Sequence, residues 1–234
     1  TLGGLLVGIG WMAASFAPDI TTLTLLYGVI GGTGVGIVYG CPIAVVAKWF
    51  PQKSGLAIGL TVMGFGLSAL ITAPLMKAMI IHPEIGTLNT FFYLGIGFLF
   101  IVSLLAQCLC FPPDEWSSAN VITHSSATTV NPTIELSRHD MIRTRHFYAL
   151  WATYTIGCLA GLMAIGIASP VGIEVAKLEP TTAAFAISLF AIFNGLGRPL
   201  FGIIADKLGP KQTAMLSFAM IGGASLLLSG LEEG

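Results

Sequence analysis

Long apolar stretches separated by short polar segments dominate the chain. The hydrocarbon core of a bilayer is about 30 Å thick, so a helix needs about 20 mainly apolar residues to cross it. Backbone groups within lipid must be hydrogen-bonded internally, and stretches of this length without alternating polarity therefore fold as helices. The pattern predicts seven spanning helices, over residues 1–17, 21–47, 54–81, 88–111, 146–173, 181–205 and 213–231.

The distribution of positive charge orients these predicted helices. Lys and Arg are concentrated in the cytoplasmic loops of membrane proteins. Loops on one predicted side contain most of these residues, namely Lys48, Lys53, Arg138, Arg143, Arg145, Lys207 and Lys211. The other side has only Lys77 and Lys177. We therefore expect segments 48–53, 112–145 and 206–212 to be cytoplasmic, in a multi-pass protein of the plasma (cell inner) membrane.

Composition narrows the class of protein further. Hydrophobic residues make up 55% of the 234 residues and charged residues only 9%, with a net charge of −1. Soluble domains are about one quarter charged, so this chain has too little polar surface for a cytosolic enzyme. The balanced charge also excludes a nucleic-acid partner, because there is no basic surface to neutralise phosphates. The expected partner is the lipid bilayer.

A polar segment divides the chain into two groups of helices. Residues 112–145 are rich in Ser, Thr, Asn and charge, which is typical of a flexible cytoplasmic linker. We expect residues 1–111 to be part of an N-terminal bundle with four helices and residues 146–234 part of a C-terminal bundle with three. The alternative for the linker is a regulatory loop with phosphorylation sites. Because the chain begins at Thr1 without a leader, we expect it to be a piece of a longer protein.

Small residues recur on one face of the second predicted helix, at Gly28, Gly32, Gly36 and Gly40. GxxxG spacing lets two membrane helices approach closely, so helix packing is favoured over a direct role in a permeation path. The pairs Gly55/Gly59 and Gly157/Gly161 are too common in membrane helices to be informative individually. Pro42, Pro74 and Pro199 predict kinks, which transporters use around binding sites.

One formal charge lies deep within a predicted helix. Arg198 precedes Asp206, at the cytoplasmic edge, by eight residues, which places it roughly 12 Å into the membrane at about 1.5 Å per residue. Arg at such depth costs at least about 2.5–3.5 kcal/mol and needs an anionic or carbonyl partner. Asn194 lies one turn earlier on the same face, and Pro199 frees the carbonyl of Gly195 beside it.

Two interpretations of Arg198 remain open. In the first it is an internal strut, paired with Asp206 or with a carboxylate outside these seven helices. In the second its planar guanidinium binds a substrate carboxylate through two hydrogen bonds. The second is favoured because no carboxylate lies deep in any of the seven predicted helices. The same absence favours anion exchange over proton coupling, which often uses a membrane Asp or Glu.

Three stretches carry a resemblance to a known family. The segment from Gly202 through Asp206, Lys207 and Gly209 to Lys211 resembles the G-x-x-x-D-[R/K]-x-G-x-[R/K] signature of the major facilitator superfamily. Residues 48–60 are similar to the helix 4–5 junction of oxalate/formate antiporters and monocarboxylate transporters. Residues 194–199 resemble their eighth-helix segment, which carries a substrate-binding Arg. Within the superfamily the oxalate/formate antiporter family is the nearest resemblance.

This resemblance implies an all-α fold, in which the seven helices are helices three to nine of a twelve-helix transporter truncated at both ends. It also implies alternating access around a central site, with aromatic side chains near the anion. Asn194 stands where monocarboxylate transporters have an acidic residue, which speaks against their proton relay. The implied substrate-binding residues are Arg198, Asn194, Tyr39 and Tyr154. The implied conformational latch is Gly202, Asp206, Lys207, Gly209 and Lys211, in which the adjacent cations brace Asp206 near the helix end.

The predicted function is secondary active transport of small organic anions, mono- or dicarboxylates such as oxalate, formate or lactate, by antiport. The alternatives are transport of another small solute, with Arg198 structural, or a channel-like membrane protein. An enzyme is not expected, because neither a G-x-S-x-G nor a G-x-x-x-x-G-K-[S/T] motif occurs. We expect no metal and no cofactor, and a monomer that binds a small organic anion.

Overall fold

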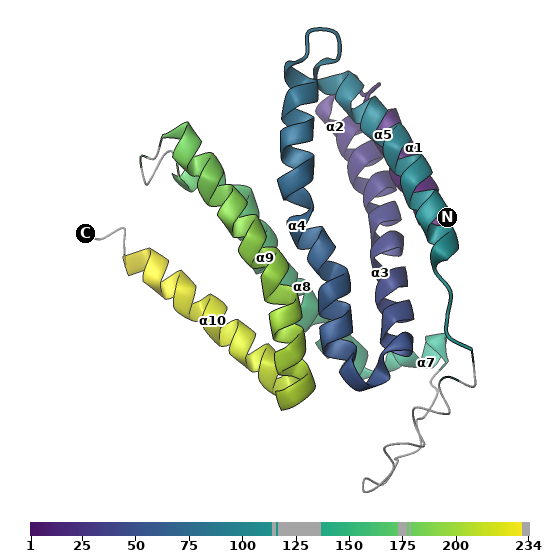
Figure 1. Ribbon diagram of the computed structural model, residues 1–234, viewed down its shortest axis with the longest axis vertical. Coiled ribbons are helices and arrows are strands. Elements are labelled where there is room, and N and C mark those ends of the chain that lie inside the picture. The colour runs from purple at the N-terminus through teal and green to yellow at the C-terminus, as the bar shows by residue number, and fades with distance from the viewer. Residues whose placement is uncertain (114–115, 117–136, 173–176, 178, 231–234) are drawn as a thin grey trace, which may run out of the picture.

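The computed structural model describes residues 1–113, 116, 137–172, 177 and 179–230. Within these residues every regular element is helical, which confirms the all-α prediction. Figure 1 shows the helices as long rods, with α1 and α5 on one side of the molecule and α10 on the other. The longer helices are α1 (Leu2–Ala14), α3 (Gly32–Trp49), α4 (Ser54–Ile81), α5 (Gly86–Leu105), α8 (Arg145–Pro170), α9 (Pro180–Leu208) and α10 (Pro210–Gly230).

Five helical segments in the described part of the chain are long and apolar enough to cross a membrane. They are Ile20–Trp49, Pro51–Ile81, Gly86–Cys108, Arg145–Gly166 and Ser188–Leu208. The first predicted span forms the 13-residue helix α1, which is apolar but shorter. The seventh forms α10, which is helical but is not among the five. All seven predicted spans are thus helices, with five meeting the criteria for a membrane span.

The second predicted span is a composite helix. Asp19 caps its start, where one carboxylate oxygen accepts a 2.8 Å hydrogen bond from the Thr22 backbone N–H. The short helix α2 (Ile20–Leu23) passes into a π-helical segment, η1 (Thr24–Gly31), and then into α3. α3 ends at Trp49 because Phe50, which precedes a proline, leaves the helical conformation. A single 3₁₀ turn, η2 (Pro51–Lys53), then leads directly into α4.

The N-terminal helices pack around α1. α1 contacts both α3 and α5, and its glycines lie close to those helices. A Cβ atom built on Gly34 of α3 would lie 2.6 Å from the Val7 backbone nitrogen of α1. The prediction that the face with Gly28, Gly32, Gly36 and Gly40 packs closely on another helix is wrong for the described residues. A Cβ at Gly32, Gly36 or Gly40 would meet nothing within 4 Å, because the face that packs on α1 is the one that carries Gly34.

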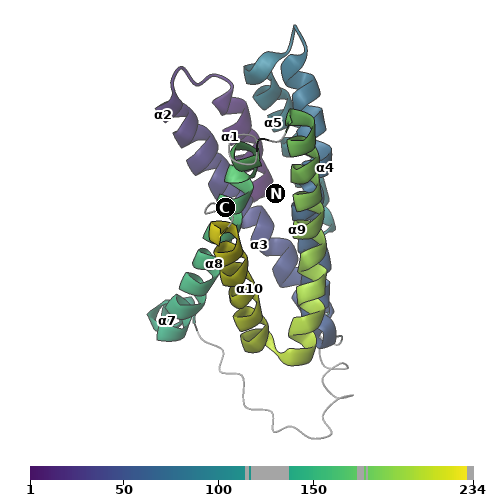
Figure 2. The ribbon, with the colours of Figure 1, turned by 90° about the vertical axis from the view of Figure 1, so that its left-hand side faces the viewer.

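Among the described helices, the most extensive contact is that of α4 with α9, which lie side by side in both ribbon views (Figures 1 and 2). Their backbones meet at glycines. A Cβ on Gly59 would lie 2.5 Å from the carbonyl oxygen of Arg198, and one on Gly66 would lie 2.6 Å from the Cα of Gly195. Gly55 and Gly202 face each other in the same way, near the start of α4 and the end of α9. Gly55 and Gly59 therefore form a helix interface, which their spacing alone did not distinguish from chance.

Candidate functional site

Arg198 lies in the middle of α9, half-buried, and contacts two other helices. Its Nη1 donates a 3.1 Å hydrogen bond to the hydroxyl oxygen of Tyr39 on α3. Its guanidinium carbon lies 5.1 Å from the centroid of the Phe65 ring on α4. Helices α3, α4 and α9 therefore converge on one guanidinium group.

The three side chains support one another. The rings of Tyr39 and Phe65 meet edge to face, with centroids 5.6 Å apart and an interplanar angle of 74°. An aromatic ring face attracts a cation, and the phenol oxygen accepts from the same group. These contacts hold the guanidinium of Arg198 from two directions without neutralising its charge, since neither Tyr39 nor Phe65 is an anion.

The Nε atom of Arg198 is buried and has no hydrogen-bond partner among the residues that the structure describes. Within the described residues, Arg198 forms no ion pair with a carboxylate. In particular, Asp206 bonds elsewhere, so the interpretation of Arg198 as a strut to Asp206 is wrong. A buried guanidinium N–H without a partner forfeits its hydration and favours the arrival of an acceptor. The geometry leaves this edge of the guanidinium without a partner.

The remaining predicted site residues lie nearby but differ in their contacts. The Tyr154 hydroxyl on α8 lies close enough to the Tyr39 hydroxyl and the Cys158 thiol to interact with both. Even so, 61% of the Tyr154 surface is exposed. Asn194 is half-buried one turn before Arg198, and its amide makes no hydrogen bond to any described residue. Tyr39 and Arg198 are thus in direct contact, Tyr154 lies beside them, and Asn194 contributes no described contact.

The predicted latch residue Asp206 holds the N-terminus of α4. Its two carboxylate oxygens accept hydrogen bonds from the backbone N–H groups of Gly55, at 2.8 Å, and Leu56, at 2.9 Å. The first N–H groups of a helix lack intrahelical partners and carry partial positive charge, so a carboxylate is stabilised there. This contact joins the C-terminal end of α9 to the start of α4.

The other residues of the predicted latch lie at the C-terminal end of α9 or just after it. Gly202 brings the α9 backbone against Gly55, and Gly209 ends the helix with a φ of +86°, which favours glycine. The expectation that adjacent cations brace Asp206 is wrong within the described chain. Lys207 and Lys211 are exposed and form no ion pair with Asp206, because its oxygens face the backbone of α4.

Sequence reasoning missed Phe65 and the backbone donors of Gly55 and Leu56. The one available signal for Phe65 is its position between two glycines, Gly64 and Gly66, as the single aromatic residue of α4. The backbone donors have no side-chain signature. No cluster of metal-ligating side chains occurs among the residues that the structure covers.

Comparisons with known proteins agree with this architecture. A family model described as "Major Facilitator Superfamily" matches residues 1–232. The chain is 28% identical to the oxalate:formate antiporter of Oxalobacter formigenes, over 93% of the chain and 49% of that protein. It is 26% identical to monocarboxylate transporter 13 of Bos taurus, over 99% of the chain and 51% of that protein.

A shorter segment is more similar to another relative. Over 34% of the chain and 15% of the relative, the identity with human monocarboxylate transporter 12 is 38%. The chain spans about half the length of the first two relatives. The comparison therefore covers nearly all of this chain but only part of each transporter.

Proposed function

Because the chain belongs to the major facilitator superfamily, we propose that it carries small organic anions across the membrane, with Arg198 as the group that binds their carboxylate. The relatives named as an oxalate:formate antiporter and as monocarboxylate transporters support a carboxylate cargo. The observation that carries the proposal is the arrangement around Arg198, which is positioned by neutral groups and has a partnerless Nε.

The geometry around Arg198 suits a carboxylate for two reasons. Hydrogen bonding of Nη1 to Tyr39 and the cation–π contact with Phe65 orient the guanidinium before the substrate arrives. Preorganisation of this kind lowers the ordering cost of binding. The Nε–H and a neighbouring N–H can then donate in parallel to two carboxylate oxygens, which is the strongest geometry available to Arg. Tyr154, beside Tyr39, and Asn194, one turn away, are the further substrate-binding residues of the proposal.

We propose exchange of anions rather than proton symport. Each Asp or Glu residue of the described chain lies at a helix end, in a connecting segment or in the short helix α7 (Arg138–Arg143). These residues are Asp19, Glu84, Asp140, Glu179 and Asp206. A carboxylate at the depth of Arg198 is the usual site of a coupled proton. Exchange of one anion for another needs no such group, since the second anion neutralises Arg198 on the return step.

Alternating access would separate the two halves of this site. In the proposed arrangement residues 1–111 belong to one bundle, residues 146–234 to the other and residues 112–145 to the cytoplasmic loop between them. Asp206 and the α4 N-terminus then form a contact between bundles at the cytoplasmic side. Gly202, Gly209, Lys207 and Lys211 are the remaining residues of this proposed latch. The protein is proposed to act as a monomer in the cell inner membrane.

Reconstituted vesicles test this function directly. Vesicles that contain the intact protein are loaded with one carboxylate, and counterflow of labelled oxalate, formate, lactate and a neutral sugar is measured. We expect saturable uptake of a carboxylate that depends on internal anion, and none of the sugar. A channel gives no acceleration by internal substrate, and uptake driven by a pH gradient alone would contradict exchange.

Two substitutions assign the role of Arg198. Arg198→Lys keeps the positive charge but loses the paired donors, so we expect weakened carboxylate binding that remains measurable. Arg198→Gln removes the charge, and we expect carboxylate binding to be lost. Normal carboxylate affinity in the Gln variant would overturn the proposal and return Arg198 to a structural role.

A further inference from the structure

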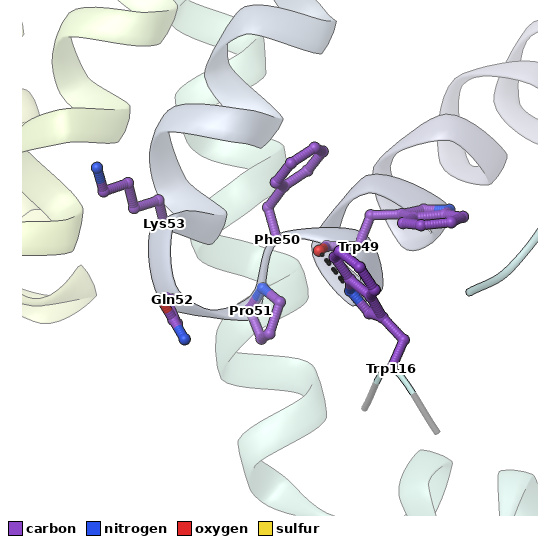
Figure 3. A pocket seen from close by; sticks show the side chains of 6 residues that line it. All are labelled: Trp49, Phe50, Pro51, Gln52, Lys53 and Trp116. Carbon is purple, nitrogen blue, oxygen red and sulfur yellow. Dashed lines mark hydrogen bonds between the residues drawn. The ribbon is translucent and has the colours of Figure 1, made fainter. Parts of the chain in front are cut away.

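Two tryptophans attach the chain that follows α5 to the end of α3. The indole Nε1 of Trp116 donates a 3.1 Å hydrogen bond to the Trp49 carbonyl oxygen, and the indole Nε1 of Trp49 donates a 2.9 Å bond to the Cys110 carbonyl oxygen. Their ring centroids lie 5.5 Å apart (Figure 3). We call this reciprocal contact of Trp49, Trp116 and the Cys110 carbonyl the tryptophan clasp.

The clasp satisfies a group that a helix end leaves unpaired. Trp49 is the last residue of α3, and the final carbonyl groups of a helix have no intrahelical donor. The indole of Trp116 supplies that donor from 67 residues away. Nearby, the ammonium of Lys48 lies 4.7 Å from the centroid of the Phe111 ring, which adds a second attachment between the same two segments.

The clasp borders the turn that leads into α4. Both indoles line a pocket of about 150 Å³ together with Phe50, Pro51, Gln52 and Lys53. Figure 3 shows the Trp116 indole directed at the Trp49 carbonyl, with their hydrogen bond as a dashed line, Pro51 next to it and Lys53 on the far side of the turn. The single 3₁₀ turn Pro51–Lys53 separates the clasp from α4, whose residues Gly55 and Leu56 bond to Asp206.

We propose that the tryptophan clasp is a conformational brace, which fixes the α3–α4 turn and so keeps the N-terminus of α4 on the Asp206 carboxylate. By holding that contact it favours the arrangement in which the cytoplasmic ends of α4 and α9 meet. The proposal rests on the superfamily's helix arrangement and on the proposed latch, and it does not depend on which solute is carried.

Amide hydrogen exchange of the full protein in nanodiscs tests the brace. The N–H groups of Gly55 and Leu56 have Asp206 as their acceptor, so their exchange reports that contact. In Trp116→Phe, which keeps a ring but lacks the N–H, we expect these two amides to exchange about fivefold faster, the effect of one neutral hydrogen bond. Trp116→Ala also removes the ring contact and should have a larger effect.

A matched control separates bracing from general loosening. Trp151 on α8 is 60% exposed and has no hydrogen-bond or ring partner within the part of the chain that is described, so Trp151→Ala should leave these amides unchanged. The amide of buried Thr90 on α5 should also keep its protection in the Trp116 variants. Unchanged exchange at Gly55 and Leu56 in Trp116→Ala overturns the proposal, and so does an equal rise at Thr90.

Counterflow measured on the same samples distinguishes the two proposals. If no carboxylate is carried by the unmodified protein while Trp116→Ala accelerates exchange at Gly55 and Leu56, the proposed cargo fails and the brace stands. If carboxylates are exchanged and the amides do not respond, the brace fails alone.

Discussion

Arg198 and Tyr39 are 159 residues apart in the chain, and their side chains share a 3.1 Å hydrogen bond from Nη1 to the hydroxyl oxygen. Arg198 belongs to a helix of the proposed C-terminal bundle and Tyr39 to one of the proposed N-terminal bundle. Any motion that separates α3 from α9 at this depth breaks the bond. A carboxylate bound to the free edge of Arg198 would then compensate for the lost acceptor.

Tyr39→Phe is expected to weaken carboxylate binding about tenfold, since it removes one hydrogen bond to a charged group and leaves the ring in place. The half-saturation concentration for counterflow measures this effect. Tyr27→Phe is the matched control, because Tyr27 packs in an aromatic cluster with Trp11 and Phe91 and its hydroxyl has no described partner. Equal affinities for the two variants would show that the Tyr39 hydroxyl does not position Arg198.

Phe65→Leu is expected to raise the half-saturation concentration by about two- to tenfold, because the aliphatic side chain keeps apolar volume but loses the cation–π contact. Phe65→Tyr retains a ring face and should restore most of the affinity. The rescue distinguishes a role of the ring face from a role of packing alone. A Leu variant with unchanged affinity would be inconsistent with this role of Phe65.

Gly59→Ala is expected to disrupt the contact of α4 with α9. The new Cβ would lie 2.5 Å from the Arg198 carbonyl oxygen and 2.7 Å from the Pro199 Cα, and neither backbone atom can move aside without shifting a helix. Overpacking of this kind costs about 1–3 kcal/mol. The midpoint temperature of thermal unfolding in detergent and the rate of counterflow should both fall.

Gly64→Ala on the same helix provides the control for that substitution. A Cβ at Gly64 meets nothing within 4 Å, and Ala is the better helix former. We therefore expect Gly64→Ala to leave the stability of the protein unchanged or to raise it slightly. The difference in stability between the two variants then measures the effect of the α4–α9 interface. Equal effects at Gly59 and Gly64 would argue against a close contact between α4 and α9.

Asp206→Asn should release the start of α4. The amide has one acceptor oxygen where the carboxylate has two, so one of the two N–H groups loses its present acceptor, and the amide lacks the negative charge that a helix N-terminus stabilises. In a Ser54→Cys background, we expect the rate of thiol labelling from the proposed cytoplasmic side to rise at least about tenfold. The reason is that hydrogen bonds to charged groups stabilise more than neutral ones. Asp140→Asn, a change at an exposed carboxylate without a described partner, should leave labelling unchanged.

Much of the fold follows from the sequence because lipid imposes a simple rule. Apolar length alone identified every long helix of the described residues. The division at residues 112–145 stays a prediction. The π-helical turn η1 was not predictable, since residues 24–31 have the same apolar character as the α-helix that follows. Helix contacts were predicted less well, because spacing of small residues does not say which face meets a neighbour. Gly28–Gly40 and Gly55/Gly59 have the same motif, but a close contact forms only at the second.

The candidate site was predicted to a similar extent. Arg198 was identified because a charge within an apolar helix is costly, and Asp206 because of its motif. Phe65 and the backbone amides of Gly55 and Leu56 were not, since an apolar ring in a membrane helix is ordinary and a backbone donor is the same at every position. Their roles depend on which helix lies opposite, and that is a property of the tertiary structure.

The glycine contacts between α4 and α9 also bear on how fast this surface can part and rejoin. Where Gly55 meets Gly202 and Gly59 meets the Arg198 backbone, backbone atoms of the two helices lie directly against each other, and the Asp206 carboxylate is the side chain beside Gly55. Few side-chain rotamers must therefore be selected when the helices come together, and little side-chain conformational entropy is lost. Such a surface suits the alternating access proposed above.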